Sequence, residues 1–134
     1  MKTSSVMIVE DDARVRSMIR RIIDDIVSVY ECANAEEAVA LYGRIRPDLV
    51  LMDLRMEGVD GLSATRTIRA ASPEARIIIV TSYDAPDLRE AARQAGATDY
   101  VVKDDLSGLR AIVKRATESA LLRERDGSFS TGNR

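Results

Sequence analysis

The stretch DLVLMDLRMEGVDG, at residues 48–61, decides the fold of this chain. It contains four consecutive apolar residues, Leu49 to Met52, which is the pattern of a strand buried on both faces of a parallel sheet. Asp53 follows at once, then comes a turn with two glycines, and helical periodicity begins at Leu62. The stretch therefore predicts one strand, loop and helix unit of an α/β protein.

The same alternation of short apolar runs and helical periodicity recurs along the chain. A helix is expected after each of five strands, which lie at 6–9, 29–32, 49–52, 77–80 and 100–102. Such repeats form right-handed crossovers on both faces of a parallel sheet. We therefore predict a doubly wound (βα)5 domain over residues 1–125, followed by a flexible C-terminal tail or linker at 126–134.

Polar caps and helix breakers mark the expected helix ends. Asp12 and Asn34 are placed to cap the first and second helices. Pro86 opens the fourth helix, Gly96 ends it in a left-handed conformation, and the fifth helix is expected to begin near Ser107. The apolar face expected for the first helix consists of Val15, Met18, Ile19, Ile22, Ile23 and Ile26.

Composition and charge exclude several classes of function. Twenty basic against twenty-two acidic residues give a net charge of -2, so we expect no direct binding of nucleic acid by this chain. No apolar run is long enough for a membrane span or signal peptide, so we expect a cytoplasmic protein without membrane association. Cys32, the single cysteine, is expected to be a buried thiol. The chain has no histidine, so any histidine chemistry must come from a partner.

Polar residues follow four of the five expected strands. They are Glu10 and Asp11 after the first, Asp53 after the third, Thr81 after the fourth and Lys103 after the fifth. In a parallel sheet the carboxyl ends of the strands meet at one crevice, so these side chains are expected to be neighbours. Asp53 is the best candidate nucleophile, because a carboxylate can accept a phosphoryl group when the charge on the phosphoryl oxygens is neutralised.

The acidic residues of this set predict a magnesium site. Clustered carboxylates repel one another unless a cation joins them, and Mg²⁺ binds one or two carboxylates together with water and phosphate oxygens. Glu10, Asp11 and Asp53 are the expected ligands. The hydroxyl of Thr81 can donate to a phosphoryl oxygen, and the ammonium of Lys103 can pair with one. Together these residues predict a pocket for Mg²⁺ and a phosphoryl group.

Over about residues 5–123 the chain resembles the receiver domains of two-component response regulators. The matching motifs are VEDD at 9–12, DLVLMDLRMEGVDG at 48–61, IIIVTS at 77–82 and AGATDYVVKDD at 95–105. Lys103 followed by Asp104 resembles the receivers that are attached to helix-turn-helix output domains of the LuxR type. Glu57 stands where the family usually has proline, so we expect a looser loop there.

The resemblance implies a flavodoxin-like sheet in strand order 2-1-3-4-5, with Asp53 as the phosphoacceptor. It implies that Mg²⁺ is held by Glu10, Asp11, Asp53 and the backbone carbonyl of Arg55, and that Lys103 binds the phosphoryl group. It also implies that Thr81 and Tyr100 form a switch pair.

Our leading hypothesis is a signalling receiver. A sensor histidine kinase or a histidine phosphotransfer protein would present phosphohistidine to Asp53, and the receiver would catalyse only its own phosphorylation and dephosphorylation. The surface of the fourth helix, fifth strand and fifth helix would then change, providing a homodimer or effector interface. Arg55 and Tyr83 are predicted to flank the phosphoryl group and obstruct the attacking water.

Three alternatives compete with this hypothesis. A phosphatase of the haloacid dehalogenase type also uses an aspartate nucleophile, but it needs a second acid where this chain has Arg55. A flavodoxin-like cofactor binder needs a phosphate loop where this chain has acids. A pseudo-receiver would keep the fold for protein contacts alone. The chain is expected to be a stand-alone receiver or the N-terminal part of a longer regulator.

Overall fold

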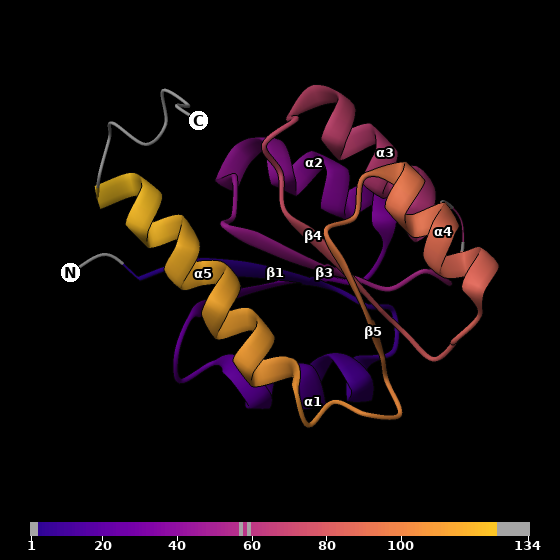
Figure 1. The fold of residues 1–134 in the computed structure, drawn as a ribbon, viewed down its shortest axis with the longest axis horizontal. Helices are drawn as coiled ribbons and strands as arrows, with labels where there is room; N and C mark the ends of the chain where they lie inside the picture. The colour runs from indigo at the N-terminus through magenta and orange to yellow at the C-terminus, as the bar shows by residue number, and fades with distance from the viewer. Residues whose placement is uncertain (1–2, 57, 59, 126–134) are drawn as a thin grey trace.

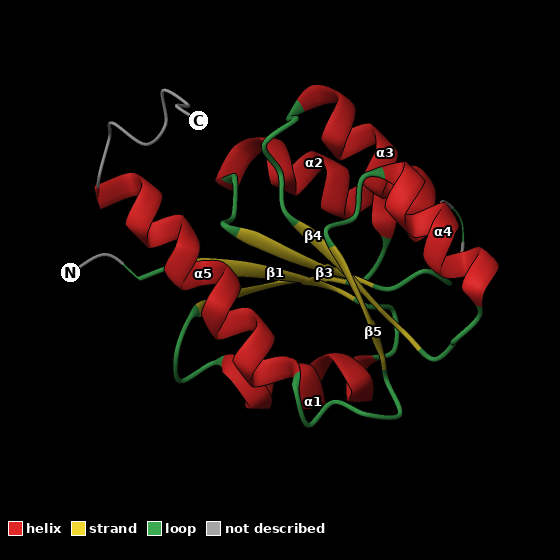
Figure 2. Ribbon diagram, viewed as in Figure 1, coloured by secondary structure: helices red, strands yellow, loops and turns green. Residues whose placement is uncertain are grey.

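The computed structural model describes residues 3–56, 58 and 60–125, with side chains as far as residue 118. In this part of the chain, strands and helices alternate (Figures 1 and 2). The elements in chain order are β1 (Ser5–Val9), α1 (Ala13–Ile23), β2 (Ser28–Cys32), α2 (Ala35–Ile45), β3 (Leu49–Met52), α3 (Gly61–Ala71), β4 (Ile77–Thr81), α4 (Pro86–Ala95), β5 (Asp99–Val102) and α5 (Leu109–Arg125).

The strands form one parallel sheet in the order β2-β1-β3-β4-β5, which confirms the predicted flavodoxin-like fold. Val9 pairs with Met52, and Met52 pairs with Ile79, so β1 and β3 end at the same level and β4 extends two residues further, to Thr81. Thr81 pairs with Val102 on the other side. The residues that follow these strands therefore emerge side by side at the carboxyl edge of the sheet.

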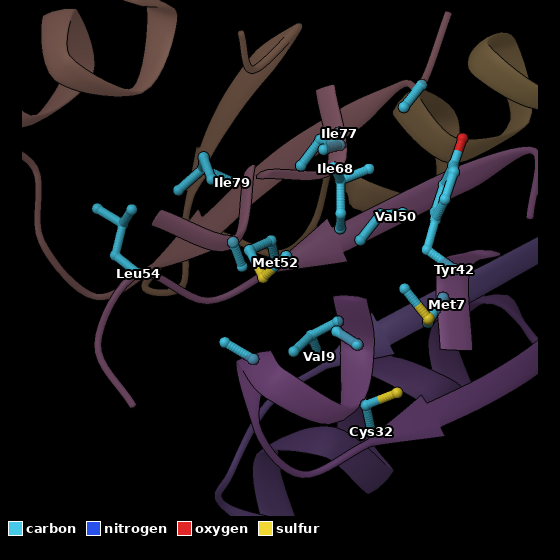
Figure 3. Close-up of a cluster of buried hydrophobic side chains, with 14 of the residues drawn as sticks. Met7, Val9, Cys32, Tyr42, Val50, Met52, Leu54, Ile68, Ile77 and Ile79 are labelled. Carbon is cyan, nitrogen blue, oxygen red and sulfur yellow. The ribbon is translucent and has the colours of Figure 1, made fainter. Parts of the chain in front are cut away.

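Helices cover both faces of the sheet, with α2, α3 and α4 on one face and α1 and α5 on the other (Figure 1). Alternate residues of a strand point to opposite faces. Thus Met7 lies in the core under α2 and α3, shown in Figure 3, while Ile8 lies in the core under α1 and α5. Because both faces are covered, β3 and β4 are apolar almost throughout rather than alternating.

The predicted helix caps are confirmed. The Asp12 carboxylate accepts hydrogen bonds from two backbone N–H groups of α1, and the Asn34 side chain accepts one from α2. Gly96 ends α4 at a φ of 107°, in the left-handed region. The last helix begins at Leu109, which is near Ser107 as expected. The Asp105 carboxylate accepts hydrogen bonds from both the N–H and the hydroxyl of Ser107, which holds that residue in a turn.

Two residues of the apolar face expected for the first helix differ from the prediction. Ile26 lies in the turn after α1, which ends at Ile23, although it still packs against the core under α1 and α5. The Met18 side chain is 47% exposed, because it lies about 100° around the helix from the buried Ile19. Cys32 is buried as predicted. Among the described residues, no helix is both long and apolar enough to cross a bilayer. Glu57 and the proposed tail at 126–134 lie outside the described residues, so the expectations for them and the 1–125 domain boundary stay predictions.

Candidate functional site

The turn between β1 and α1 carries the first two acids of the site. The Glu10 backbone N–H donates to the Cys32 carbonyl at 3.1 Å, which continues the pairing of β1 with β2 by one residue. Its carboxylate is buried, and Oε2 accepts a hydrogen bond from the Asp12 N–H at 3.1 Å. Asp11 is exposed. The turn therefore offers one buried and one solvent-facing carboxylate.

Asp53 is held between β1 and the start of α3. Its N–H donates to the Val9 carbonyl at 3.0 Å, and the Gly61 N–H donates to the Leu54 carbonyl at 2.9 Å. A Cβ atom on Gly61 would lie 2.0 Å from the carbonyl oxygen of Asp53, which is far inside van der Waals contact. Only glycine lets α3 begin this close to Asp53, so the backbone under this carboxylate is tightly placed.

The structure brings the three predicted acids together. Carboxylate oxygens of Glu10, Asp11 and Asp53 all lie within 4.8 Å of one another. Hard oxygen donors at this spacing suit Mg²⁺, which binds few protein carboxylates and keeps several waters. The exposure of Asp11 leaves room for such waters on the solvent side. The residues present therefore fit the predicted cation.

Lys103 reaches into the acidic cluster from β5. Its Nζ lies 2.6 Å from Glu10 Oε1 and 3.4 Å from Asp53 Oδ2, and its side chain is only 14% exposed. The Lys103 N–H donates to the Thr81 carbonyl at 2.6 Å, which fixes its backbone beside β4. One ammonium thus lies between two buried carboxylates.

Burial governs the protonation of this cluster. It raises the pKa of both Glu10 and Asp53, against the opposing pull of the Lys103 ammonium. Burial alone would lower the pKa of Lys103, but the hydrogen bond to Glu10 and the charge of Asp53 outweigh it, so this pKa is raised. Lys103 therefore stays cationic at neutral pH, and two carboxylates share its charge.

These residues border a pocket of about 270 Å³ at the carboxyl edge of the sheet. Arg55 and Tyr83 are part of its wall, and the guanidinium of Arg55 lies 4.6 Å from the centroid of the Tyr83 ring. Thr81 is fully buried and is not among the described residues that line the pocket. Its hydroxyl lies 3.4 Å from the Tyr83 N–H, which donates to it.

Tyr100 is joined to this wall from the neighbouring strand. Its hydroxyl donates to the Tyr83 carbonyl at 2.5 Å, and the Arg89 guanidinium lies 4.6 Å from the centroid of its ring. Burial raises the pKa of Tyr100, while the charge of Arg89 opposes the shift. The predicted switch residue therefore contacts the loop between β4 and α4 through one hydrogen bond, and α4 through one cation–π contact.

Sequence reasoning missed several residues of this region, among them Ser82 in the pocket wall. Arg16, a residue of α1 that the sequence analysis gave no role, donates through Nη1 to the Glu10 carbonyl at 2.7 Å. Gly61 and Arg89 were also given no role. Sequence spacing holds no signal for the contacts of the two arginines, but a glycine directly after the α3 cap residue Asp60 points to a close approach of two backbones.

A five-stranded parallel sheet in this order, with an aspartate-centred acidic pocket at its carboxyl edge, defines a class of small signalling domains. The family model described as the response regulator receiver domain matches residues 6–114, and the chain belongs to this family.

Relatives and solved structures agree with this family. The chain is 36% identical over 115 residues to the regulatory protein AtoC of Escherichia coli K12, covering 84% of this chain and 25% of AtoC. It is 35% identical over 100 residues to the chemotaxis protein CheY of Listeria monocytogenes, covering 73% of this chain and 84% of CheY. A crystal structure of a LuxR-family two-component response regulator from Aurantimonas sp. SI85-9A1 superimposes with a TM-score of 0.82 at 36% identity. The match covers 88% of this chain and 87% of the chain in the crystal structure. The chain spans between 25% and 51% of the length of four larger curated relatives that it matches.

Proposed function

We propose that this chain receives a phosphoryl group on Asp53 from a phosphohistidine of a sensor histidine kinase or a histidine phosphotransfer protein. One observation carries the proposal: the Lys103 ammonium lies 2.6 Å from Glu10 and 3.4 Å from Asp53, beside a third carboxylate of the same cluster. Within the described residues this arrangement joins a buried nucleophile, a cation ready to pair with phosphoryl oxygens, and oxygen ligands for a divalent metal.

The reaction is a transfer between two nucleophiles. An oxygen of the Asp53 carboxylate attacks the phosphorus, the phosphorus–nitrogen bond breaks, and its electron pair returns to the imidazole of the partner. Lys103 pairs with the phosphoryl oxygens and remains protonated throughout. Mg²⁺, held by Glu10, Asp11, Asp53 and the Arg55 carbonyl, would neutralise charge on the phosphoryl group when bound. The chain modifies itself and turns over no separate substrate.

Phosphorylation is proposed to change the surface of α4, β5 and α5. The Thr81 hydroxyl would move to donate to a phosphoryl oxygen, and Tyr100 would adjust its contacts with the loop that Thr81 leaves. Two contacts support this route: Lys103 is bonded to the Thr81 backbone, and Tyr100 to the backbone of Tyr83. The changed surface would form a homodimer or bind an effector. We place this exchange in the cytoplasm, with no direct contact to nucleic acid.

Arg55 and Tyr83 are proposed to lengthen the life of the phosphorylated state. Their stacked side chains form part of the pocket wall, and a phosphoryl group on Asp53 would lie beneath them. Water must approach phosphorus from the side opposite the carboxylate oxygen for in-line attack. Replacing both residues with alanine should therefore speed the loss of phosphate, and an unchanged half-life would contradict this role.

Intact mass spectrometry after incubation with acetyl phosphate and Mg²⁺ tests the main proposal. We expect the wild-type chain to gain one phosphoryl group and the Asp53→Asn variant to gain none. Asp25→Asn is the matched control, because Asp25 is an exposed carboxylate paired with Arg110 outside the pocket. Equal labelling of Asp53→Asn and wild type would reject Asp53 as the acceptor. Size-exclusion chromatography of the same samples reports whether phosphorylation also drives dimerisation.

A further inference from the structure

We infer that Arg16 is a positioning residue for the acidic pocket, because it fixes the peptide group that joins Glu10 to Asp11. In this way it sets how the two carboxylates face a divalent cation. The inference rests on the proposed function, since it concerns the Mg²⁺ site of the same pocket.

Arg16 reaches back from the second turn of α1 to the end of β1. Its Nη1 donates to the Glu10 carbonyl at 2.7 Å, while its Nε donates to the Glu31 carboxylate at 2.9 Å. The side chain is only 19% exposed. A guanidinium bound at two of its nitrogens has little freedom to move. Arg16 is therefore a rigid brace between the β1–α1 turn and the edge strand β2.

The carbonyl that Arg16 binds belongs to the peptide group between the two candidate ligands. The N–H of Glu10 is held by Cys32, so its backbone is fixed on both sides. If the Arg16 bond were lost, this peptide group could rotate, and the Asp11 side chain would turn with it. The mutual placement of the Glu10 and Asp11 carboxylates thus depends on one hydrogen bond from α1.

Arg20 provides a matched control within the same helix. It lies four residues after Arg16 and carries the same charge. Its ion pairs in the described part of the chain are with Glu31, at 2.5 Å, and Asp24, at 3.8 Å. The two arginines therefore share Glu31, but the bond to the Glu10 carbonyl comes from Arg16. Replacing either one removes a positive charge and an ion pair with Glu31.

If Arg16 acts by positioning, its replacement should change Mg²⁺ affinity in the opposite direction from that expected if it acts only through its charge. Removing a cation near an acidic pocket should strengthen the binding of a second cation, because the electrostatic repulsion falls. Loss of positioning should weaken binding, because two ligands are no longer held in place. Partners that orient metal ligands typically change metal affinity by at least about tenfold. The direction of the change therefore separates the two explanations.

The experiment measures Mg²⁺ affinity by calorimetric titration of the metal alone into the wild-type chain, Arg16→Met, Arg16→Lys and Arg20→Met. We expect Arg16→Met to weaken binding about tenfold and Arg20→Met to leave it unchanged or slightly tighter. Arg16→Lys should recover part of the lost affinity, because an ammonium can reach either the Glu10 carbonyl oxygen or the Glu31 carboxylate but cannot bind both at once. Methionine keeps the apolar stem of the side chain, and thermal unfolding checks that each variant is folded.

A second readout needs no metal. In ¹⁵N spectra of the metal-free protein, Arg16→Met should shift the amide signals of Asp11 and Asp12, whereas Arg20→Met should leave them in place. Mg²⁺ binding by Arg16→Met that equals or exceeds wild type, or unshifted amide signals, would overturn the inference while leaving the proposed function intact. A wild-type chain that binds Mg²⁺ but is never phosphorylated would overturn the proposed function alone.

Discussion

Strand β3 consists of buried apolar residues, and Asp53, the residue that follows it, is also buried but has an ionisable side chain. The same contrast holds for β1, where Ile8 is 0% exposed among apolar neighbours and Glu10, just past the strand, is 2% exposed among polar ones. The interior of the sheet and its carboxyl edge are thus built from the same strands, with opposite energetic consequences.

The difference shows that burial stabilises the fold in the interior of the sheet but lowers its stability at the carboxyl edge, where the candidate site lies. Burial of apolar side chains in the sheet interior contributes favourably to folding. At the edge, burial raises the pKa values of Glu10 and Asp53, which means that their charged forms are disfavoured by the folded structure. One ammonium, from Lys103, offsets two carboxylates. Binding of a further cation should therefore stabilise the carboxyl edge, whereas it should not affect the apolar interior.

The largest expected effect comes from breaking the interior. Ile8→Ala should lower the free energy of unfolding by about 2–5 kcal/mol, because it leaves a cavity in the core under α1 and α5. Urea unfolding measures the loss, and Met18→Ala, at an exposed site, is the control. Where Ile8→Ala is still folded, its Mg²⁺ affinity should match wild type. A parallel loss of Mg²⁺ affinity would show that interior and edge are coupled.

Gly61→Ala should affect both regions at once. Its methyl group would displace the Asp53 peptide, at an expected cost of about 1–3 kcal/mol in unfolding free energy and with impaired phosphorylation of Asp53. Gly43→Ala in α2 is the matched control, because its added methyl group would meet nothing within 4 Å beyond its own stretch of helix, and it should stabilise the helix by about 0.5–1 kcal/mol. Normal labelling of folded Gly61→Ala would contradict the close fit.

Asp53→Asn should raise stability in the absence of Mg²⁺, by on the order of 1 kcal/mol at neutral pH. The folded structure raises the pKa of Asp53, so this group lowers stability as pH rises from its unfolded-state pKa to its folded-state pKa, and the full loss is present above the folded-state pKa. The stability gained by Asp53→Asn should therefore shrink as pH falls, because the wild-type Asp53 carboxyl then becomes protonated in both the folded and the unfolded chain. Adding Mg²⁺ should stabilise wild type more than the variant, and melting temperatures across pH and Mg²⁺ measure this. Equal stabilisation of both would argue against Asp53 as a ligand.

The interior was predictable from sequence because it depends on local pattern. Apolar runs fixed the strands to within about one residue, and the predicted caps Asp12, Asn34 and Gly96 were confirmed, since each cap acts on its own helix. Met18 was misplaced because periodicity gives a stripe but not its edges. The start of α5 was predicted only approximately, near Ser107, and it falls at Leu109 because the side chain of Asp105 holds Ser107 in a turn.

The edge was predictable in its membership but not in its contacts. Strand ends in a parallel sheet converge, so Glu10, Asp11 and Asp53 could be grouped from sequence, and the structure does bring them together. The brace from Arg16 could not be foreseen, because a charge on a helix gives no sign of which backbone oxygen it will bind. Thr81 lies at the end of β4 as expected, but it is fully buried and is not among the described residues that line the pocket, because its burial depends on the surrounding packing.

The smallest expected effect concerns Cys32, which lies where the two regions meet: its thiol is buried in the core, and its carbonyl binds the Glu10 N–H. Burial raises the pKa of this thiol to about 11. At pH 8 roughly one thiol in a thousand is then ionised, so iodoacetamide should react far more slowly with the native chain than with the urea-unfolded chain, whose thiol has a pKa of about 8.5.

The rate of alkylation of the native chain should rise steadily with pH towards 11, and Mg²⁺ should leave this rate unchanged if interior and edge are independent. Slowing of the reaction by Mg²⁺ at constant pH would instead show that closing the acidic pocket also tightens the core beside it.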